Sequence, residues 1–324
     1  MDASENAAIL VLGMHRSGTS AVAGALRLLG VTSPAHLIPA TPDNPSGFGE
    51  ANSILGTNDW ILNEGATTWY ECLRFDSAAL DARTRATALT FIMLCLMSEF
   101  NGAPLKLIKD PRICLLLDLW LPALSAAGTS PVAMLVLRSP NEVADSLAAR
   151  ERLPVAISAA LWLRYMLAAE FATRFSPRHV VAYDDLLRDW RGTLELAGTR
   201  AGIKWPISLD KAAPRMSKFL DVRHRHFGGV VRPNTIGAMP FGVWLEEAYA
   251  ALLALAQDGD DARQFDRLDR VHKAFLTWCA AHGRAWSDAF LHKHDIRARR
   301  QFEVPADWHR IARDLPNTVA LAVE

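Results

Sequence analysis

Residues Leu10–Leu26 read LVLGMHRSGTSAVAGAL, and this stretch decides the fold class. Its first residues continue an apolar run from Ala7 to Leu12, which predicts a strand buried on both faces, as in a parallel sheet. The run ends at Gly13. From Ser17 to Gly30 the apolar residues recur near the helical period, and the final glycine is a typical helix end. The chain therefore passes from a buried strand through a short Gly-x-x-x-x-Gly loop into a helix.

The loop between Gly13 and Gly18 has the composition of an anion cradle. Backbone N–H groups and the positive end of the helix dipole favour an anion at such a place. Gly13 permits a tight turn, and Gly18 permits close approach of the anion. The expected cofactor-binding residues here are His15, Arg16, Ser17, Gly18, Thr19 and Ser20. His15 either donates to the anion or packs beneath the loop, and a glycine-containing turn without a ligand is the alternative for the whole loop.

Position 19 distinguishes this loop from the phosphate loop of nucleoside triphosphatases. Their pattern, G-x-x-x-x-G-K-[ST], requires a lysine where this chain has Thr19, and that lysine reaches the terminal phosphates. The sequence therefore argues against ATP or GTP hydrolysis and favours an anion with fewer phosphates.

Strand and helix patterns alternate along the next part of the chain, which predicts an α/β protein. Further buried strands are expected at Leu105–Ile108, Val132–Leu137 and His179–Ala182. The helices are expected at Thr84–Phe100, Asn141–Arg150, Pro154–Phe175, from the YDDLLRDW segment to about Gly202, Phe241–Gln257 and Arg263–His282. We predict a three-layer sandwich with a central parallel sheet over residues 1–240, and a helical C-terminal extension of the same domain over residues 241–324. The segment from about 33 to 74 is rich in Pro, Gly, Asn and Asp and is expected to be a lid loop.

Composition excludes several broad classes of protein. The 324 residues include 35 basic and 35 acidic side chains and are 50% hydrophobic, which excludes a wholly disordered chain and argues against a nucleic-acid partner. No CxxC motif, signal peptide or run of 18 apolar residues is found, so we expect reduced thiols, no integral membrane contact and a cytoplasmic location. His224 and His226 lack a third ligand nearby, and no metal site is expected.

Two segments carry a resemblance to a known family. GMHRSGTS resembles the 5′-phosphosulfate loop of sulfotransferases that use 3′-phosphoadenosine-5′-phosphosulfate (PAPS). After the strand VAMLVL comes LRSPNEVADSL, in which Arg138 and Ser146 lie eight residues apart. In the family such an Arg at a strand end and such a Ser on the next helix hold the 3′-phosphate of the nucleotide, and an Arg offers two fixed donors. Taken alone, Arg138 could equally be a surface residue at a strand end, and Ser146 would be read as a polar residue on a helix face.

Weaker matches follow. The segment Tyr183–Trp190 (YDDLLRDW) is similar to the family's Tyr-x-Asp-Leu segment, although Asp184 or Asp185 could simply cap a helix. Arg223 and Arg225 could contact the 3′-phosphate or lie in a solvated basic loop. The resemblance covers roughly residues 7–205.

Sulfuryl transfer needs a base for the acceptor proton and donors for the leaving phosphate oxygen. Glu50, in NPSGFGE, is similar in position to the catalytic Glu of carbohydrate-type relatives. Lys109 is similar to a Lys that contacts the sulfuryl group, and Asp110 is the second candidate base. The His that follows this Lys in cytosolic relatives is absent, and Arg112 could instead form an ion pair with Asp110.

The resemblance thus implies transfer of a sulfuryl group from PAPS to a hydroxyl or amine, with a carbohydrate or glycoconjugate as the preferred acceptor and 3′,5′-ADP as the second product. A kinase for a small metabolite and a non-catalytic nucleotide-binding scaffold are the alternatives. Trp60, Trp69 and Tyr70 could form an acceptor platform or anchor the lid loop. The C-terminal helices could form an oligomer interface.

Overall fold

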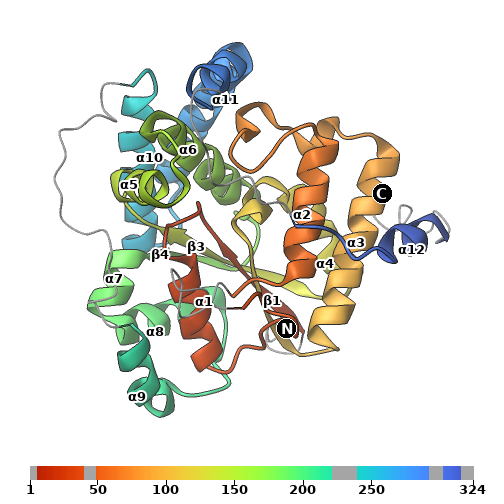
Figure 1. The fold of residues 1–324 in the computed structure, drawn as a ribbon. Coiled ribbons are helices and arrows are strands. Elements are labelled where there is room, and N and C mark those ends of the chain that lie inside the picture. Colours follow the sequence, from red (N-terminus) through yellow and green to blue (C-terminus); the bar gives the residue numbers. More distant parts are fainter. Residues whose placement is uncertain (1–5, 40–48, 221–238, 292–301, 315–324) are drawn as a thin grey trace.

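A four-stranded, all-parallel sheet forms the centre of the computed structural model, which describes residues 6–39, 49–220, 239–291 and 302–314 (Figure 1). The strand order is β2-β1-β3-β4. The strands are β1 (Ala7–Leu12), β2 (Leu105–Lys109), β3 (Ser130–Leu137) and β4 (Arg178–Ala182). All four expected strands are therefore confirmed, and the α/β class with them.

The register of the sheet brings the ends of the strands together. Val11 of β1 pairs with Lys109 of β2, and Leu12 pairs with Leu135 of β3. The residues that follow these strands therefore share one edge of the sheet. Because β2 and β3 lie on opposite sides of β1, the strand order reverses between β1 and β3, and α/β sheets bind ligands at such a point.

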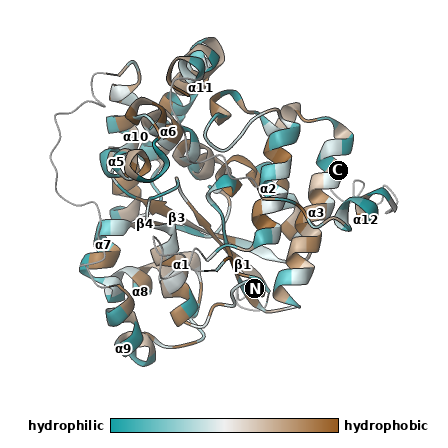
Figure 2. Cartoon of the chain, in the orientation of Figure 1, coloured by the Kyte–Doolittle hydropathy of each residue, from teal (hydrophilic) through white to brown (hydrophobic). Residues whose placement is uncertain are grey.

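Helices cover both faces of the sheet (Figure 1). One face carries α1 (Thr19–Leu28), α7 (Tyr183–Arg188), α8 (Trp190–Ala201) and α9 (Leu209–Phe219). The other carries α2 (Asn52–Glu64), α3 (Ala82–Phe100), α4 (Leu117–Ala126), α5 (Pro140–Glu151), α6 (Val155–Ala172), α10 (Gly242–Asp258) and α11 (Ala262–Leu291). Alternate residues of β1 point into the two cores, so the strand is apolar along its whole length (Figure 2).

The segment expected to be a lid loop is only partly irregular. Within the described parts of residues 33–74, α2 occupies Asn52–Glu64, and a short 3-10 helix, η1, occupies Cys72–Arg74. The side chains of Ile54, Ile61 and Leu62 belong to the core. The expectation of a lid loop was therefore wrong for Asn52–Glu64, because this helix buries polar residues such as Thr57 and Asn58, which a sequence pattern does not mark as core.

The C-terminal helices share the main core rather than forming a separate one. Side chains of α10 and α11, including Leu245, Leu252 and Phe275, pack in the same cluster as α6 and the sheet. A last helix, α12 (Trp308–Asp314), lies beside α3. By length and composition α6 is apolar enough to cross a membrane, but 78% of its residues are buried, as in the core helix of a folded domain.

Candidate functional site

The loop between β1 and α1 has the two glycines where the backbone requires them. Gly13 has φ +144°, and a Cβ there would lie 2.8 Å from the carbonyl oxygen of Val136 on the neighbouring strand. Gly18 has φ +94°, and a Cβ there would lie 2.3 Å from the ring of Tyr183. Any larger residue would therefore displace the strand end or the ring.

Polar atoms of this loop are left without partners among the described residues. The backbone turns back on itself, since the Ser17 amide donates to the Met14 carbonyl oxygen over 3.1 Å. Ser17 Oγ and His15 Nε2 are buried and accept or donate no hydrogen bond in this part of the chain. Gly18 caps α1 without any side-chain hydrogen bond. Backbone N–H groups at the start of a helix lack intrahelical partners and can bind an anion. The side chain of Thr19 is buried, with its methyl group near Gly13.

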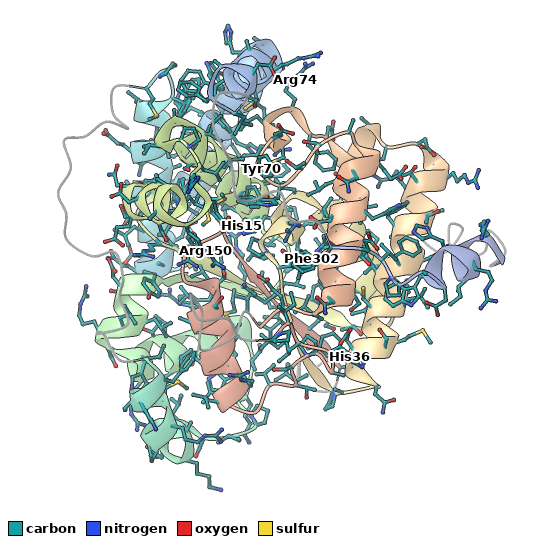
Figure 3. All side chains as sticks on the ribbon, in the orientation of Figure 1. His15, His36, Tyr70, Arg74, Arg150 and Phe302 are labelled. Carbon is teal, nitrogen blue, oxygen red and sulfur yellow. The ribbon has the colours of Figure 1, made fainter. Side chains whose placement is uncertain are left out.

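His15 packs beneath the loop. Its ring lies 4.1 Å from that of Trp69 and 5.9 Å from that of Tyr165, between centroids. Burial, reinforced by the positive charges of Arg112 and Lys109, lowers the pKa of His15 well below its usual value. The charge of Arg150 acts in the same direction, and Figure 3 labels both residues. The imidazole is therefore neutral at physiological pH.

Arg138 and Ser146 lie against the loop. Arg138 follows β3 and is 8% exposed; its Nη1 donates to the carbonyl oxygen of Arg16 over 3.1 Å, and its Nε donates to Glu142 Oε2 over 2.7 Å. Ser146, on α5, is fully buried, and its Oγ accepts a hydrogen bond of 3.0 Å from Arg16 Nε. The two sequence motifs thus meet through Arg16, whose φ of +70° is unusual for a residue with a side chain.

Tyr183 joins the third motif to the same place. It is the first residue of α7, directly after β4. Its ring lies against Gly18, and the Arg138 guanidinium carbon is 5.0 Å from the ring centroid. Asp184 and Asp185 lie in the first turn of α7 but do not cap it, since the N-cap residue is Ala182. Tyr183 is the first residue of the YDDLLRDW segment, and the sequence alone indicated no role for its side chain.

Glu50 and Lys109 form a buried pair at the end of β2. Lys109 Nζ donates to Glu50 Oε1, and the residues are 3% and 8% exposed respectively. The same Nζ lies 3.3 Å from Ser20 Oγ, at the start of α1. Burial raises the pKa of Glu50, and the negative charge of Asp110 adds to this, while Lys109 opposes it. A carboxylate and an ammonium group therefore stand next to the loop.

Asp110 is fully buried and has both oxygens engaged. Its Oδ1 accepts from the Arg112 amide over 3.2 Å and from Nη1 of Arg112 over 3.0 Å, and its Oδ2 accepts from Asn58 over 2.7 Å. Arg112 Nε lies 2.6 Å from Asp59 Oδ1. The ion pair with Arg112 is thus present, and it fixes the short 3-10 helix η3 (Pro111–Leu115) that follows β2.

The network around Asp110 extends to residues that the sequence did not indicate. Asn58 Oδ1 accepts from Trp120 Nε1 over 2.9 Å, and Asp59 Oδ2 accepts from the Phe302 amide over 3.1 Å. Burial raises the pKa of Asp59, against the attraction of Arg112. Asn58 and Asp59 were overlooked because they lie on α2, in the stretch expected to be a loop.

The aromatic residues of the lid segment act as anchors. Trp69 and Tyr70 are buried, and the Trp69 carbonyl oxygen accepts a hydrogen bond of 2.8 Å from Tyr165. Trp60 packs edge-on against Phe91, with ring centroids 4.9 Å apart. The candidate residues Arg223, His224, Arg225 and His226 lie outside the described residues.

One edge of the sheet thus carries a loop with two positive-φ glycines at a helix start, an Arg and a Ser beside it, and a buried Glu–Lys pair. Comparisons with protein-family models, with curated proteins and with solved structures gave no significant match.

Proposed function

We propose that this chain is a PAPS-dependent sulfotransferase with a P-loop-like phosphate-binding loop in a three-layer α/β sandwich. It would transfer a sulfuryl group to a hydroxyl or amine of a carbohydrate or glycoconjugate and release 3′,5′-ADP. The observation that carries the proposal is the hydrogen bond between Arg16 and Ser146, which joins two motifs 130 residues apart. The family resemblance implies that each motif holds one end of the same nucleotide, and the nucleotide requires that the two sites be adjacent.

The residues present suit a donor with two anionic ends. The amides at the start of α1, with Ser17 Oγ, would serve the 5′-phosphosulfate, and His15, packed beneath the loop, would support it from below. Arg138 and Ser146 would serve the 3′-phosphate. The Ser146 hydroxyl accepts from Arg16, so its own hydrogen is available for donation. Arg16 lies between the two groups and supplies a cation to both.

Glu50 is the proposed base. Its raised pKa brings the carboxylate nearer to the physiological range, where a general base works best. Glu50 would take the proton from the acceptor hydroxyl or amine. The acceptor atom would form the new bond to sulfur as the bond between sulfur and the bridging phosphate oxygen breaks, and the electron pair of that bond would stay on 3′,5′-ADP. Lys109 and Arg16 would stabilise the charge that develops on this oxygen.

Asp110 is better suited to positioning than to proton transfer. Both of its oxygens accept hydrogen bonds from protein groups, and it has no exposed surface. It holds Arg112 and η3, and thereby the chain directly after Lys109.

Calorimetry on the full chain tests the proposal. PAPS and 3′,5′-ADP should bind more tightly than ATP. Arg138→Ala should weaken 3′,5′-ADP binding by about 1–3 kcal/mol, or roughly 5- to 150-fold, because a charge-assisted hydrogen bond is lost. Arg188→Ala, at a residue whose side chain is 75% exposed, is the matched control and should leave the affinity unchanged. Absence of binding to either nucleotide by folded protein would refute the proposal, and tighter binding of ATP would favour a small-metabolite kinase.

Turnover then separates an enzyme from a nucleotide-binding scaffold. With PAPS and a panel of hydroxyl and amine acceptors, Glu50→Gln should slow transfer by about 10²- to 10⁴-fold, the usual contribution of a positioned base. Glu64→Gln, at an exposed position of α2, is the control. Donor binding with no transfer to any acceptor would favour the scaffold.

A further inference from the structure

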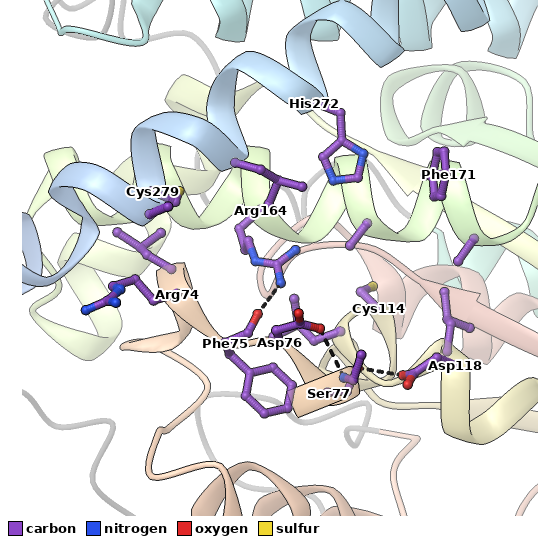
Figure 4. A pocket seen from close by; sticks show the side chains of 18 residues that line it. Arg74, Phe75, Asp76, Ser77, Cys114, Asp118, Arg164, Phe171, His272 and Cys279 are labelled. Carbon is purple, nitrogen blue, oxygen red and sulfur yellow. Dashed lines mark hydrogen bonds between the residues drawn. The ribbon is translucent and has the colours of Figure 1, made fainter. Parts of the chain in front are cut away.

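A second cavity lies behind η3, on the side where α6 and α11 pack. It has a volume of about 510 Å³ and opens between η1, the 3-10 helix η2 (Ser77–Ala79), the start of α4, α6 and α11 (Figure 4). Most of its wall is apolar, and its larger apolar side chains include Leu73, Phe75, Leu115, Leu117, Phe171 and Leu276. Its volume falls in the range that proteins use for small-molecule ligands.

Arg164 projects from α6 into this cavity (Figure 4). Its Nη2 donates to the Phe75 carbonyl oxygen over 2.6 Å, whereas its Nε is buried and has no hydrogen-bond partner among the described residues. In the same part of the chain no carboxylate lies within ion-pair distance of Arg164. A partly buried guanidinium without a counter-charge is uncommon, because desolvation of a cation is costly unless it is paired.

Two carboxylates, Asp76 and Asp118, line the cavity, but neither forms an ion pair with Arg164 among the described residues. Asp118 lies 3.0 Å from Arg85, and Asp76 accepts a hydrogen bond of 3.0 Å from the Ala78 amide. Burial, followed by the charge of Arg164, lowers the pKa of His272 to about 4, so this imidazole is neutral near pH 7. Arg74, an exposed residue at the cavity, adds a second positive charge.

The mouth of the cavity is also apolar. Phe171 is 55% exposed and Leu276 is 39% exposed, and both line the cavity. A ligand that covered them would bury surface that now faces water, at a gain of about 25 cal/mol for each Å² removed from water.

We propose that this cavity binds a small anionic amphiphile: an apolar ring system or short chain that carries one anionic head group. The apolar walls would hold the body, and the guanidinium of Arg164, which lines the cavity and has no carboxylate partner among the described residues, would hold the head. The residues that line the cavity do not include Glu50 or Lys109, so this site is separate from the proposed transfer site. The inference does not depend on sulfotransferase activity.

Titration with 2-naphthoate, and with its neutral isostere 2-naphthamide, tests the inference on the full chain. The carboxylate should bind at least about tenfold more tightly than the amide, as expected for one charge-assisted hydrogen bond. Arg164→Gln should remove this preference. Arg83→Gln, at an exposed position of α3, is the matched control and should retain it. Equal affinity of the wild-type chain for the two probes would overturn the inference.

Two further measurements locate the bound probe. Ala168→Phe fills the cavity from α6 while Arg164 is kept, and it should weaken 2-naphthoate binding at least tenfold. In the wild-type chain, which needs no substitution, the methyl resonances of Leu73 and Leu276 should shift on addition of 2-naphthoate. Unshifted methyl resonances, or displacement of the probe by 3′,5′-ADP, would place 2-naphthoate elsewhere and overturn the inference.

Discussion

A double-mutant cycle on Glu50 and Lys109 measures whether these two residues act as a unit. The variants are Glu50→Gln, Lys109→Met and the double variant, and the quantity compared is the free energy of unfolding. The structure places the two charged groups in direct contact, at 8% and 3% exposure. Either single substitution leaves one buried charge without its partner, whereas the double substitution removes both charges.

The expected coupling energy is about 2–3 kcal/mol, at the upper end for side chains in contact, because little solvent screens the pair. A matched exposed pair provides the scale. Arg188 and Asp185 lie 3.0 Å apart on α7 with side chains 75% and 38% exposed, and the same cycle there should give about 0.2–1 kcal/mol. Urea unfolding at pH 8 measures both cycles.

The pH dependence of the coupling follows from the raised pKa of Glu50. Above that pKa the carboxylate is charged and the ion pair is intact. As the pH falls through it, Glu50 takes up a proton and the attraction to Lys109 is lost. The coupling should therefore be smaller at pH 5 than at pH 8. A coupling below about 0.5 kcal/mol at pH 8 would show that the two residues are independent and would refute the reasoning.

Three further predictions concern packing and protonation. Gly18→Ala would place a Cβ 2.3 Å from the Tyr183 ring, and it should weaken 3′,5′-ADP binding at least about tenfold in calorimetry. The control is Gly202→Ala, at a position with φ +66° and open space around it, and it should leave the affinity unchanged. Equal affinities of the two variants for 3′,5′-ADP would contradict the proposed anion-binding loop. Burial lowers the pKa of His179 to about 4, so below pH 6.5 the unfolded chain takes up a proton at this residue before the folded chain does. His179→Gln should therefore reduce the loss of unfolding free energy between pH 7.5 and pH 5 by about 2 kcal/mol, as measured by urea unfolding. An unchanged loss would contradict the lowered pKa. Gly56→Ala would place a Cβ 2.3 Å from the carbonyl oxygen of Glu303 and should weaken the neighbouring hydrogen bond from the Phe302 amide to Asp59. Hydrogen exchange at the Phe302 amide should therefore become faster. Unchanged exchange would show that the chain around Glu303 can shift without losing this hydrogen bond.

The two central strands, β1 and β3, could be predicted because each contains a continuous apolar run. Both faces of β1 and β3 are buried, so nearly every side chain in them is apolar, and the pattern needs no knowledge of the partner strands. The order of the strands could not be predicted, since it depends on which runs pair. The helix α2 was missed for a related reason. Its buried face includes Thr57, Asn58 and Asp59, which resemble loop residues until their distant partners are known.

The same distinction applies to the candidate site. Local relations could be inferred from spacing, such as the Gly-x-x-x-x-Gly loop and the ion pair between Asp110 and Arg112, two residues apart. The hydrogen bond of Asn58 to Asp110 spans 52 residues, and that of Phe302 to Asp59 spans 243. No local pattern carries information about such contacts. The sequence therefore indicated the candidate residues of the site but not the long-range hydrogen bonds that fix their side chains.

The arrangement of the proposed anion-binding groups is a consequence of the sheet register. Gly18, Arg138 and Tyr183 come from the ends of β1, β3 and β4, which are consecutive neighbours in the sheet. The Tyr183 ring lies against Gly18 and also faces the Arg138 guanidinium, so the loop that would hold one end of the donor and the Arg that would hold the other touch the same side chain. If β4 were shifted by one residue against its neighbours, Tyr183 would move about 3.3 Å along the sheet, and its contacts with Gly18 and Arg138 would be lost. The spacing between the two proposed phosphate sites is therefore set by backbone pairing in the core, together with the glycines that let the loop approach its neighbours.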